Sequence, residues 1–148
     1  MTDAPELRAF KYALPTGTAA KQIVRLARTD RMFAMVQVLA EGGENNLHSH
    51  ATLDGFWFVL KGRVRFYSDF TTVAAELGPL EGILVPRGAK YWFESASKEP
   101  LELLQVECSE VPLPATQLRA NSVDRVDYEP QKESMRTLSY TEAKAPAD

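Results

Sequence analysis

The chain has 148 residues, 45% of them hydrophobic, and its 17 basic and 20 acidic side chains leave a net charge of −3. This length predicts one domain, and the mixed charge argues against a nucleic-acid or membrane partner held by electrostatic attraction. The single cysteine, Cys108, excludes an intramolecular disulfide and fits a cytoplasmic location. We expect no signal peptide, because the first residues lack a basic stretch followed by an apolar one.

In chain order, residues 1–20 are mixed in character and predict an N-terminal arm. Apolar, aromatic and β-branched runs bounded by turn residues then predict short strands at 31–40, 47–52, 56–62, 63–70, 83–86, 88–95 and 101–107. Lys61 and Gly62 resemble a tight turn, so 56–62 and 63–70 are expected to pair as a β-hairpin. Strands spaced about ten residues apart predict an all-β sandwich or barrel.

The composition changes at the C-terminal end. Residues 111–148 are polar with scattered hydrophobic side chains, so we expect an irregular extension to a single barrel domain that occupies 1–110. Part of 115–124 is compatible with a short helix. Residues 141–148 are expected to be a disordered tail.

The two histidines, His48 and His50, are separated by one residue. Side chains alternate along a strand, so an extended HxH places both imidazoles on one face. Two ring nitrogens can then meet one ion about 2 Å from each. The alternative is that two histidines lie close together by chance. Their position between a glycine turn and an aromatic strand favours a site.

Residues 42–62, GGENNLHSHATLDGFWFVLKG, resemble the first motif of the cupin superfamily, in which a glycine is followed by five residues and then an HxH pair, and another glycine closes the motif. Residues 80–95, LEGILVPRGAKYWFES, resemble the second motif around Pro86-Arg87-Gly88. The resemblance spans about 31–107. It implies a jelly-roll β-barrel with a ligand cavity, preceded by the arm and followed by the irregular polar segment.

The resemblance also implies a metal site, but this chain departs from its ligand pattern. Counting back from Gly62 places the glutamate ligand of the family at Gly55, whereas counting forward from His50 places it at Asp54. The first count is preferred, because a strand fixes the direction of a side chain more firmly than a loop does. Asp54 would then face away from the ion or lie at the rim.

In the second motif the histidine position holds Tyr91. The resemblance therefore implies an iron, manganese, zinc or nickel ion on His48 and His50 alone, which is fewer protein ligands than such ions usually have. Tyr91 is a candidate third ligand or catalytic acid. Its alternative role is an aromatic lining residue with a hydrogen-bonded hydroxyl. Ser95 and Leu80 replace the asparagine and the opening glycine of the motif.

Strand alternation suggests further inward-facing residues. Trp57, Tyr91 and Phe93 are expected to form an aromatic wall of a small-molecule pocket, although small barrels also fill their interiors with such side chains. Polar residues within apolar strands are usually solvated. Here they are Gln37, Arg65, Gln105 and Glu107. An inward-facing Glu107 would supply a carboxylate from another strand.

Three functions remain open, and the sequence does not decide whether the protein is an enzyme. The first is a metal-dependent cupin enzyme of the oxygenase, isomerase or lyase type. The second is a metal-free cupin enzyme with a histidine base and Tyr91 as acid. The third is a barrel that only binds a small organic molecule. A homodimer is also expected, because Phe56, Phe58 and Leu60 give one strand an apolar outer face.

Overall fold

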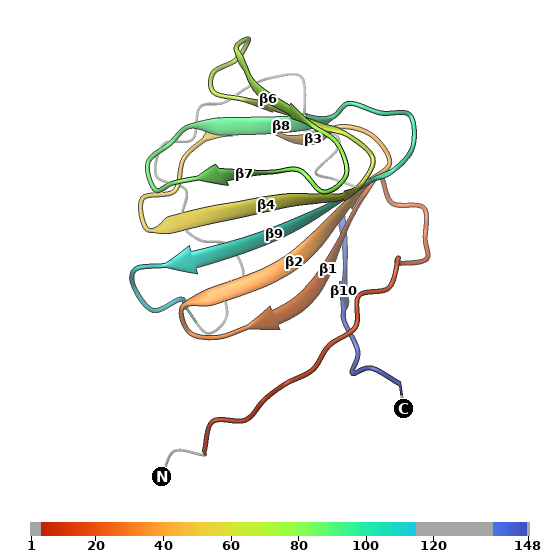
Figure 1. Ribbon diagram of the computed structural model, residues 1–148, viewed down its shortest axis with the longest axis vertical. Helices are drawn as coiled ribbons and strands as arrows, with labels where there is room; N and C mark the ends of the chain where they lie inside the picture. The colour runs from red at the N-terminus through yellow and green to blue at the C-terminus, as the bar shows by residue number, and fades with distance from the viewer. Residues whose placement is uncertain (1–3, 115–137, 148) are drawn as a thin grey trace.

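The computed structural model describes residues 4–114 and 138–147, apart from the side chains of 44–46 and 138 (Figure 1). These ranges contain strands and loops, and none of their residues belongs to a helix that is long and apolar enough to cross a membrane. The strands are β1 (Lys21–Arg28), β2 (Met32–Leu39), β3 (Gly43–His48), β4 (Leu53–Lys61), β5 (Val64–Tyr67), β6 (Val73–Leu77), β7 (Gly82–Val85), β8 (Tyr91–Ser95), β9 (Leu101–Ser109) and β10 (Leu138–Glu142).

The strands form two sheets that face each other across a common interior (Figure 1). One sheet has the order β10-β1-β2-β9-β4-β7, and the other has the order β3-β8-β5-β6. Every pairing is antiparallel except that of β1 with β10. From β2 to β5 and from β6 to β9 successive strands alternate between the sheets, in agreement with the predicted all-β jelly roll.

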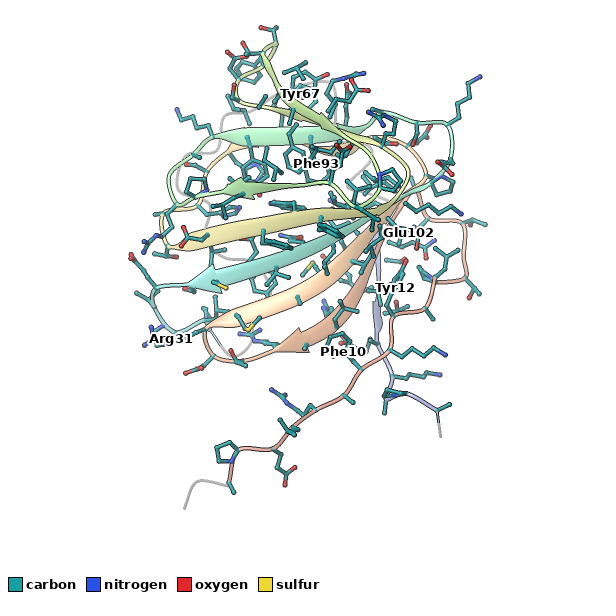
Figure 2. All side chains as sticks on the ribbon, viewed as in Figure 1. Phe10, Tyr12, Arg31, Tyr67, Phe93 and Glu102 are labelled. Atoms are coloured by element: carbon teal, nitrogen blue, oxygen red, sulfur yellow. The ribbon has the colours of Figure 1, made fainter. Side chains whose placement is uncertain are left out.

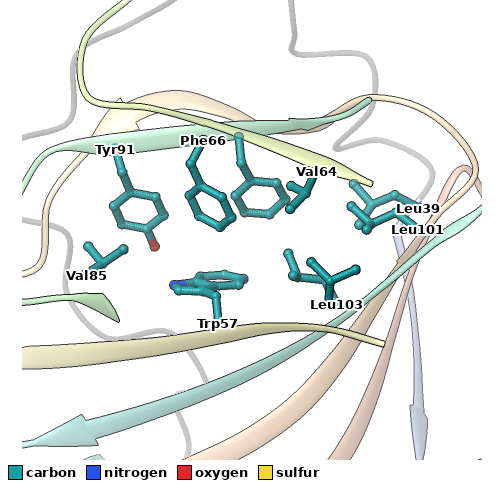
Figure 3. Close-up of a cluster of buried hydrophobic side chains, with 10 residues drawn as sticks. Leu39, Trp57, Val64, Phe66, Val85, Tyr91, Leu101 and Leu103 are labelled. Carbon is teal, nitrogen blue, oxygen red and sulfur yellow. The ribbon is translucent and has the colours of Figure 1, made fainter. Parts of the chain in front are cut away.

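Period-two burial builds the core. Along β4 the odd-numbered residues Leu53 to Val59 are buried, and along β9 the odd-numbered residues Leu101 to Ser109 are buried. Four of these residues, two from each strand, meet side chains of β5 and β8 in one apolar cluster (Figure 3). That cluster contains Leu39, Trp57, Val59, Val64, Phe66, Val85, Tyr91, Phe93, Leu101 and Leu103.

The outer face of the six-stranded sheet is partly covered by the N-terminal arm. Tyr12 packs against Val24, Val36 and Val38, and its hydroxyl donates a 2.5 Å hydrogen bond to Glu102 Oε1 (Figure 2). The arm therefore joins the barrel by apolar contact and by a phenol–carboxylate bond.

The expected hairpin between residues 56–62 and 63–70 is wrong. Strand β4 pairs with β7 and β9, whereas β5 pairs with β6 and β8 in the other sheet. Gly62, with φ of +83°, turns the chain from one sheet to the other. The crossing carries Val64 and Phe66 into the interior, where burial of both side chains favours it over a flat hairpin.

The strand expected at 47–52 is wrongly placed, because pairing with β8 starts at Gly43 and β3 ends at His48. Three further strands were not predicted. Strand β1 carries charged residues among its apolar ones, β6 is mostly exposed, and β10 lies where an irregular segment was expected. Thr141 and Glu142 belong to β10, and Lys144 bridges to Lys11, so the expectation of a disordered tail is wrong for them. Strand β10 is held in place by backbone pairing with β1. Such pairing requires no apolar pattern, so the sequence does not reveal it. The expected helix near 115–124 lies outside the described residues.

Candidate functional site

The HxH pair lies where the two sequence motifs meet. His48 ends β3, is 5% exposed, and is the cross-strand partner of Tyr91 on β8. Two residues later the carbonyl of His50 accepts a 3.0 Å hydrogen bond from the amide of Gly88. Gly88 has φ of +83°, a conformation that glycine adopts without strain. The turn of the second motif thus fixes the backbone that presents the second imidazole.

Three rings form a compact cluster. The ring centroids of His48 and His50 are 5.0 Å apart, and the centroid of Tyr91 lies 4.4 Å from that of His48. The Tyr91 hydroxyl lies 3.3 Å from Nε2 of His50, within hydrogen-bonding distance. Either group can donate, depending on the imidazole tautomer. This His48–His50–Tyr91 cluster contains both histidines of the chain and the tyrosine at the histidine position of the second motif.

The three residues predicted to form an aromatic wall lie close together, and one of them, Tyr91, also belongs to the His48–His50–Tyr91 cluster. Trp57, Tyr91 and Phe93 are all buried, and the Trp57 ring centroid lies 5.9 Å from that of Tyr91 and 5.1 Å from that of Phe93. Figure 3 shows the Tyr91 hydroxyl pointing toward Trp57, on the side where the indole carries its nitrogen. The three aromatic side chains also belong to the apolar core.

The position of the missing glutamate is filled from the neighbouring strand. Gly55 on β4 is paired with Glu107 on β9. A Cβ atom on Gly55 would lie 3.0 Å from both carboxylate oxygens of Glu107, whose side chain is only 1% exposed. A side chain at position 55 and this position of the Glu107 carboxylate therefore compete for the same space.

Asp54, the other candidate for the glutamate position, points elsewhere. Its Oδ1 accepts a 3.0 Å hydrogen bond from the amide of Arg87 and lies 3.4 Å from the Nε atom of the same residue. The side chain is 45% exposed. Asp54 thus stabilises the turn of the second motif, in agreement with the count from Gly62.

A hydrogen-bonded chain of buried side chains extends from Glu107 across the sheet. Gln37 Nε2 donates to Gln105 Oε1 over 2.8 Å, and Gln105 Nε2 donates to Glu107 Oε1 over 2.9 Å. As polar residues in apolar strands, Gln37, Gln105 and Glu107 were expected to be solvated, and this expectation is wrong because all three are buried. The fourth, Arg65, lies on the outer side and contacts Glu76 and Glu94.

This donor set does not fit the metal site that the resemblance implies. Within residues 4–114 and 138–147, no three His, Cys, Asp or Glu side chains are placed so that they could hold one ion. Glu107 lies against Gly55 and accepts a hydrogen bond from Gln105. The two histidines meet a phenol instead of a third imidazole.

Comparison with known proteins identifies the fold. The family model described as a cupin domain matches residues 35–107, which include both motifs. A search of curated proteins returned no significant match.

Solved structures support the same fold. A Klebsiella pneumoniae protein with a double-stranded β-helix domain is 19% identical, with a TM-score of 0.58, and the match covers 70% of this chain and 91% of that one. KdgF from a Halomonas species is 14% identical, with a TM-score of 0.57 and coverage of 71% and 96%. A cupin superfamily protein of Desulfitobacterium hafniense is 18% identical, with a TM-score of 0.53 and coverage of 66% and 84%. At these identities the likeness concerns the fold alone.

Proposed function

We propose, on the premise that this chain belongs to the cupin superfamily, that its barrel binds a small organic molecule at the His48–His50–Tyr91 cluster without requiring a metal ion. The observation that carries the proposal is the 3.3 Å approach of the Tyr91 hydroxyl to His50 Nε2. A partly buried imidazole–phenol pair offers both a donor and an acceptor to a ligand, and the aromatic side chains beside it offer apolar contact.

The same pair has the chemistry of an acid and a base. An imidazole exchanges protons near neutral pH, and a phenol hydroxyl is an effective donor to a developing negative charge. His50 would accept a proton at Nε2 and Tyr91 would donate one from its hydroxyl. Catalysis of an isomerase or lyase type would use these two roles, whereas a binding protein would use only their hydrogen bonds.

Ligand binding is tested by thermal shift with a library of small organic acids, alcohols and aldehydes. The wild-type chain is compared with His50→Ala and Tyr91→Phe. Tyr67→Phe is the matched control, because Tyr67 donates its hydroxyl to Glu94 outside the His48–His50–Tyr91 cluster. The proposal expects a compound that stabilises the wild type and the control but neither cluster variant. Equal stabilisation of all four proteins would place binding elsewhere.

A divalent ion on the two histidines is the second candidate function, because their rings lie 5.0 Å apart on one side of the barrel. Iron, manganese, zinc or nickel would then need solvent or ligand oxygens to complete its coordination. Metal content of untagged protein purified without chelator tests this, beside the His48→Ala/His50→Ala variant. Stoichiometric metal that disappears in the variant would favour this candidate over the first.

We also propose that a second copy of the chain covers the outer face of β4 and β7. Phe56 is 48% and Leu84 65% exposed there, and the rings of Phe56 and Phe58 stack with centroids 6.3 Å apart. A two-fold dimer buries such a patch against itself. Sedimentation should give a dimer that Phe56→Ser dissociates, while Phe10→Ser on the arm does not. A monomeric wild type would refute the proposal.

A further inference from the structure

A polar patch lies in the barrel interior beside the His48–His50–Tyr91 cluster, and the proposed function has not used it. This interior polar patch consists of Gly55, the indole N–H of Trp57 and the carboxylate of Glu107. A Cβ atom on Gly55 would lie 3.0 Å from each carboxylate oxygen and 3.1 Å from the indole nitrogen. The absence of a side chain at Gly55 therefore leaves an acceptor and a donor close to the same backbone position.

The indole nitrogen has no hydrogen-bond partner among the described residues, although Trp57 is 0% exposed. Leaving a buried donor unsatisfied is unfavourable, and most buried N–H groups in folded proteins are paired. The other tryptophan follows this rule, since Trp92 Nε1 donates to the carbonyl of Asp69 over 2.7 Å. The Trp57 indole N–H is thus a buried donor that an acceptor of a bound molecule can satisfy.

The carboxylate of Glu107 restricts which chemical group a molecule bound here can present. An ionised carboxylate only accepts hydrogen bonds and can accept several at once, and Gln105 donates to Glu107 Oε1 over 2.9 Å. A group that fits the patch must accept from the indole and donate to the carboxylate. A hydroxyl does both through one oxygen atom, whereas a second carboxylate would be repelled and an ammonium has no acceptor.

We infer that the interior polar patch binds a hydroxyl group of the small molecule, which makes the ligand a polyol or a hydroxy-carbonyl compound. A second oxygen of the same ligand would reach the His50–Tyr91 pair. Trp57 connects the two places, because its ring packs 5.9 Å from that of Tyr91, whose hydroxyl points toward it (Figure 3). This inference rests on the proposed function and specifies the substrate class of the same site.

The test follows the side-chain signals of the full chain by NMR. The chain has two tryptophans and two histidines, so its spectra contain two indole N–H signals and two imidazole signals. The probes are glycerol, xylitol, dihydroxyacetone and lactate. Dihydroxyacetone is paired with acetone and lactate with propionate, which lack the hydroxyls. Trp57→Phe assigns the Trp57 indole signal, and Trp92→Phe is the matched control that removes the other indole N–H.

The inference expects at least one hydroxyl-bearing probe to shift the Trp57 indole signal saturably, with no shift from the analogue. Trp57→Phe removes the indole donor, and Glu107→Gln removes the negative charge and one acceptor oxygen, so each should weaken its binding by roughly tenfold or more. Trp92→Phe should bind like the wild type. If Glu107→Gln fails to fold, Trp57→Phe and the wild-type titration still decide the matter.

The two sets of signals separate failure of the inference from failure of the proposed function. A probe that moves the imidazole signals but not the Trp57 indole would overturn the hydroxyl site and leave the proposed function standing. A shift of the indole alone would keep the hydroxyl site and count against the His48–His50–Tyr91 cluster. An indole signal that no probe moves is the result expected for a permanently bound water, and it would overturn the inference.

Discussion

The interior of the barrel has two ends that differ sharply, although a single strand runs through both. At Val59 of β4, the cross-strand partner on β9 is Leu103, and Val64 and Leu101 complete an apolar surrounding. Four residues earlier, at Gly55, the partner is Glu107, and the indole nitrogen of Trp57 lies nearby. The apolar end holds the sheets together, whereas the polar end leaves hydrogen-bonding capacity inside the protein.

The difference indicates which end of the interior stabilises the fold and which end is available for function. Burial of apolar surface favours folding in proportion to its area, so substitutions at the apolar end should act mainly on the free energy of unfolding. Buried polar groups gain little net stability even when paired. Their presence at one end therefore indicates a use other than folding, and the following variants test this division.

The largest effect is expected at the apolar end. Phe93→Ala removes a ring that is 0% exposed and contacts both Trp57 and Phe66. We expect the free energy of unfolding to fall by about 3–5 kcal/mol, as for other buried aromatic truncations. Urea denaturation followed by tryptophan fluorescence measures it. A loss below about 1 kcal/mol would mean that the core is loosely packed here.

A smaller loss is expected within the buried polar network. Gln37→Leu leaves Gln105 Oε1 without the 2.8 Å hydrogen bond that it now accepts. The cost of an unsatisfied buried acceptor is about 1–3 kcal/mol, which the same denaturation experiment detects. Replacing Gln105 with leucine as well would also remove the hydrogen bond to the buried Glu107 carboxylate, so the double variant should not recover this loss. A single variant as stable as the wild type would show that this network does not order the interior.

One substitution should stabilise the protein. Leu80 has φ of +68° and is the one non-glycine residue with positive φ among the described residues. Its amide donates to the carbonyl of Val59, so the turn must keep this conformation. Leu80→Gly removes strain of about 1–2 kcal/mol and raises unfolded-state entropy, for a net gain of roughly 0.5–1 kcal/mol. A lower melting temperature would contradict this account.

The smallest effect concerns alkaline pH at the outer face of the sheet. Partial burial and the hydrogen bond to Glu102 raise the pKa of Tyr12 above its usual value. A raised folded-state pKa stabilises the protein fully below about pH 10, the unfolded value, and this stabilisation is lost as pH rises above it. Tyr12→Phe should therefore flatten the alkaline fall in unfolding free energy. An unchanged slope would show that the arm is not held by this bond.

The sequence predicts the fold better than it predicts the site, for physical reasons. Apolar alternation and turn residues identify β2, β4, β5, β7, β8 and β9, because those strands bury side chains. Strands β1, β6 and β10 depend more on backbone pairing, which leaves little trace in composition. The hairpin error has the same origin, since a tight turn does not reveal which sheet the next strand joins.

For the site, motif spacing located His48, His50 and Tyr91, which the structure brings together. The inward direction of Glu107 follows from strand parity, because Leu101 and Leu103 on the same strand are buried. What the sequence did not reveal is that Gly55 and Glu107 are cross-strand partners, since the register between β4 and β9 is a long-range property.

The most direct test of the central claim is the proton–carbon imidazole spectrum of the full chain, in which His48 and His50 are the only histidines. It should be recorded during titration with small organic compounds and, separately, with divalent metals. The account predicts that an organic compound shifts both imidazole signals saturably in metal-free protein, and that Tyr91→Phe weakens this response. Signals that move only when a metal is added would contradict it.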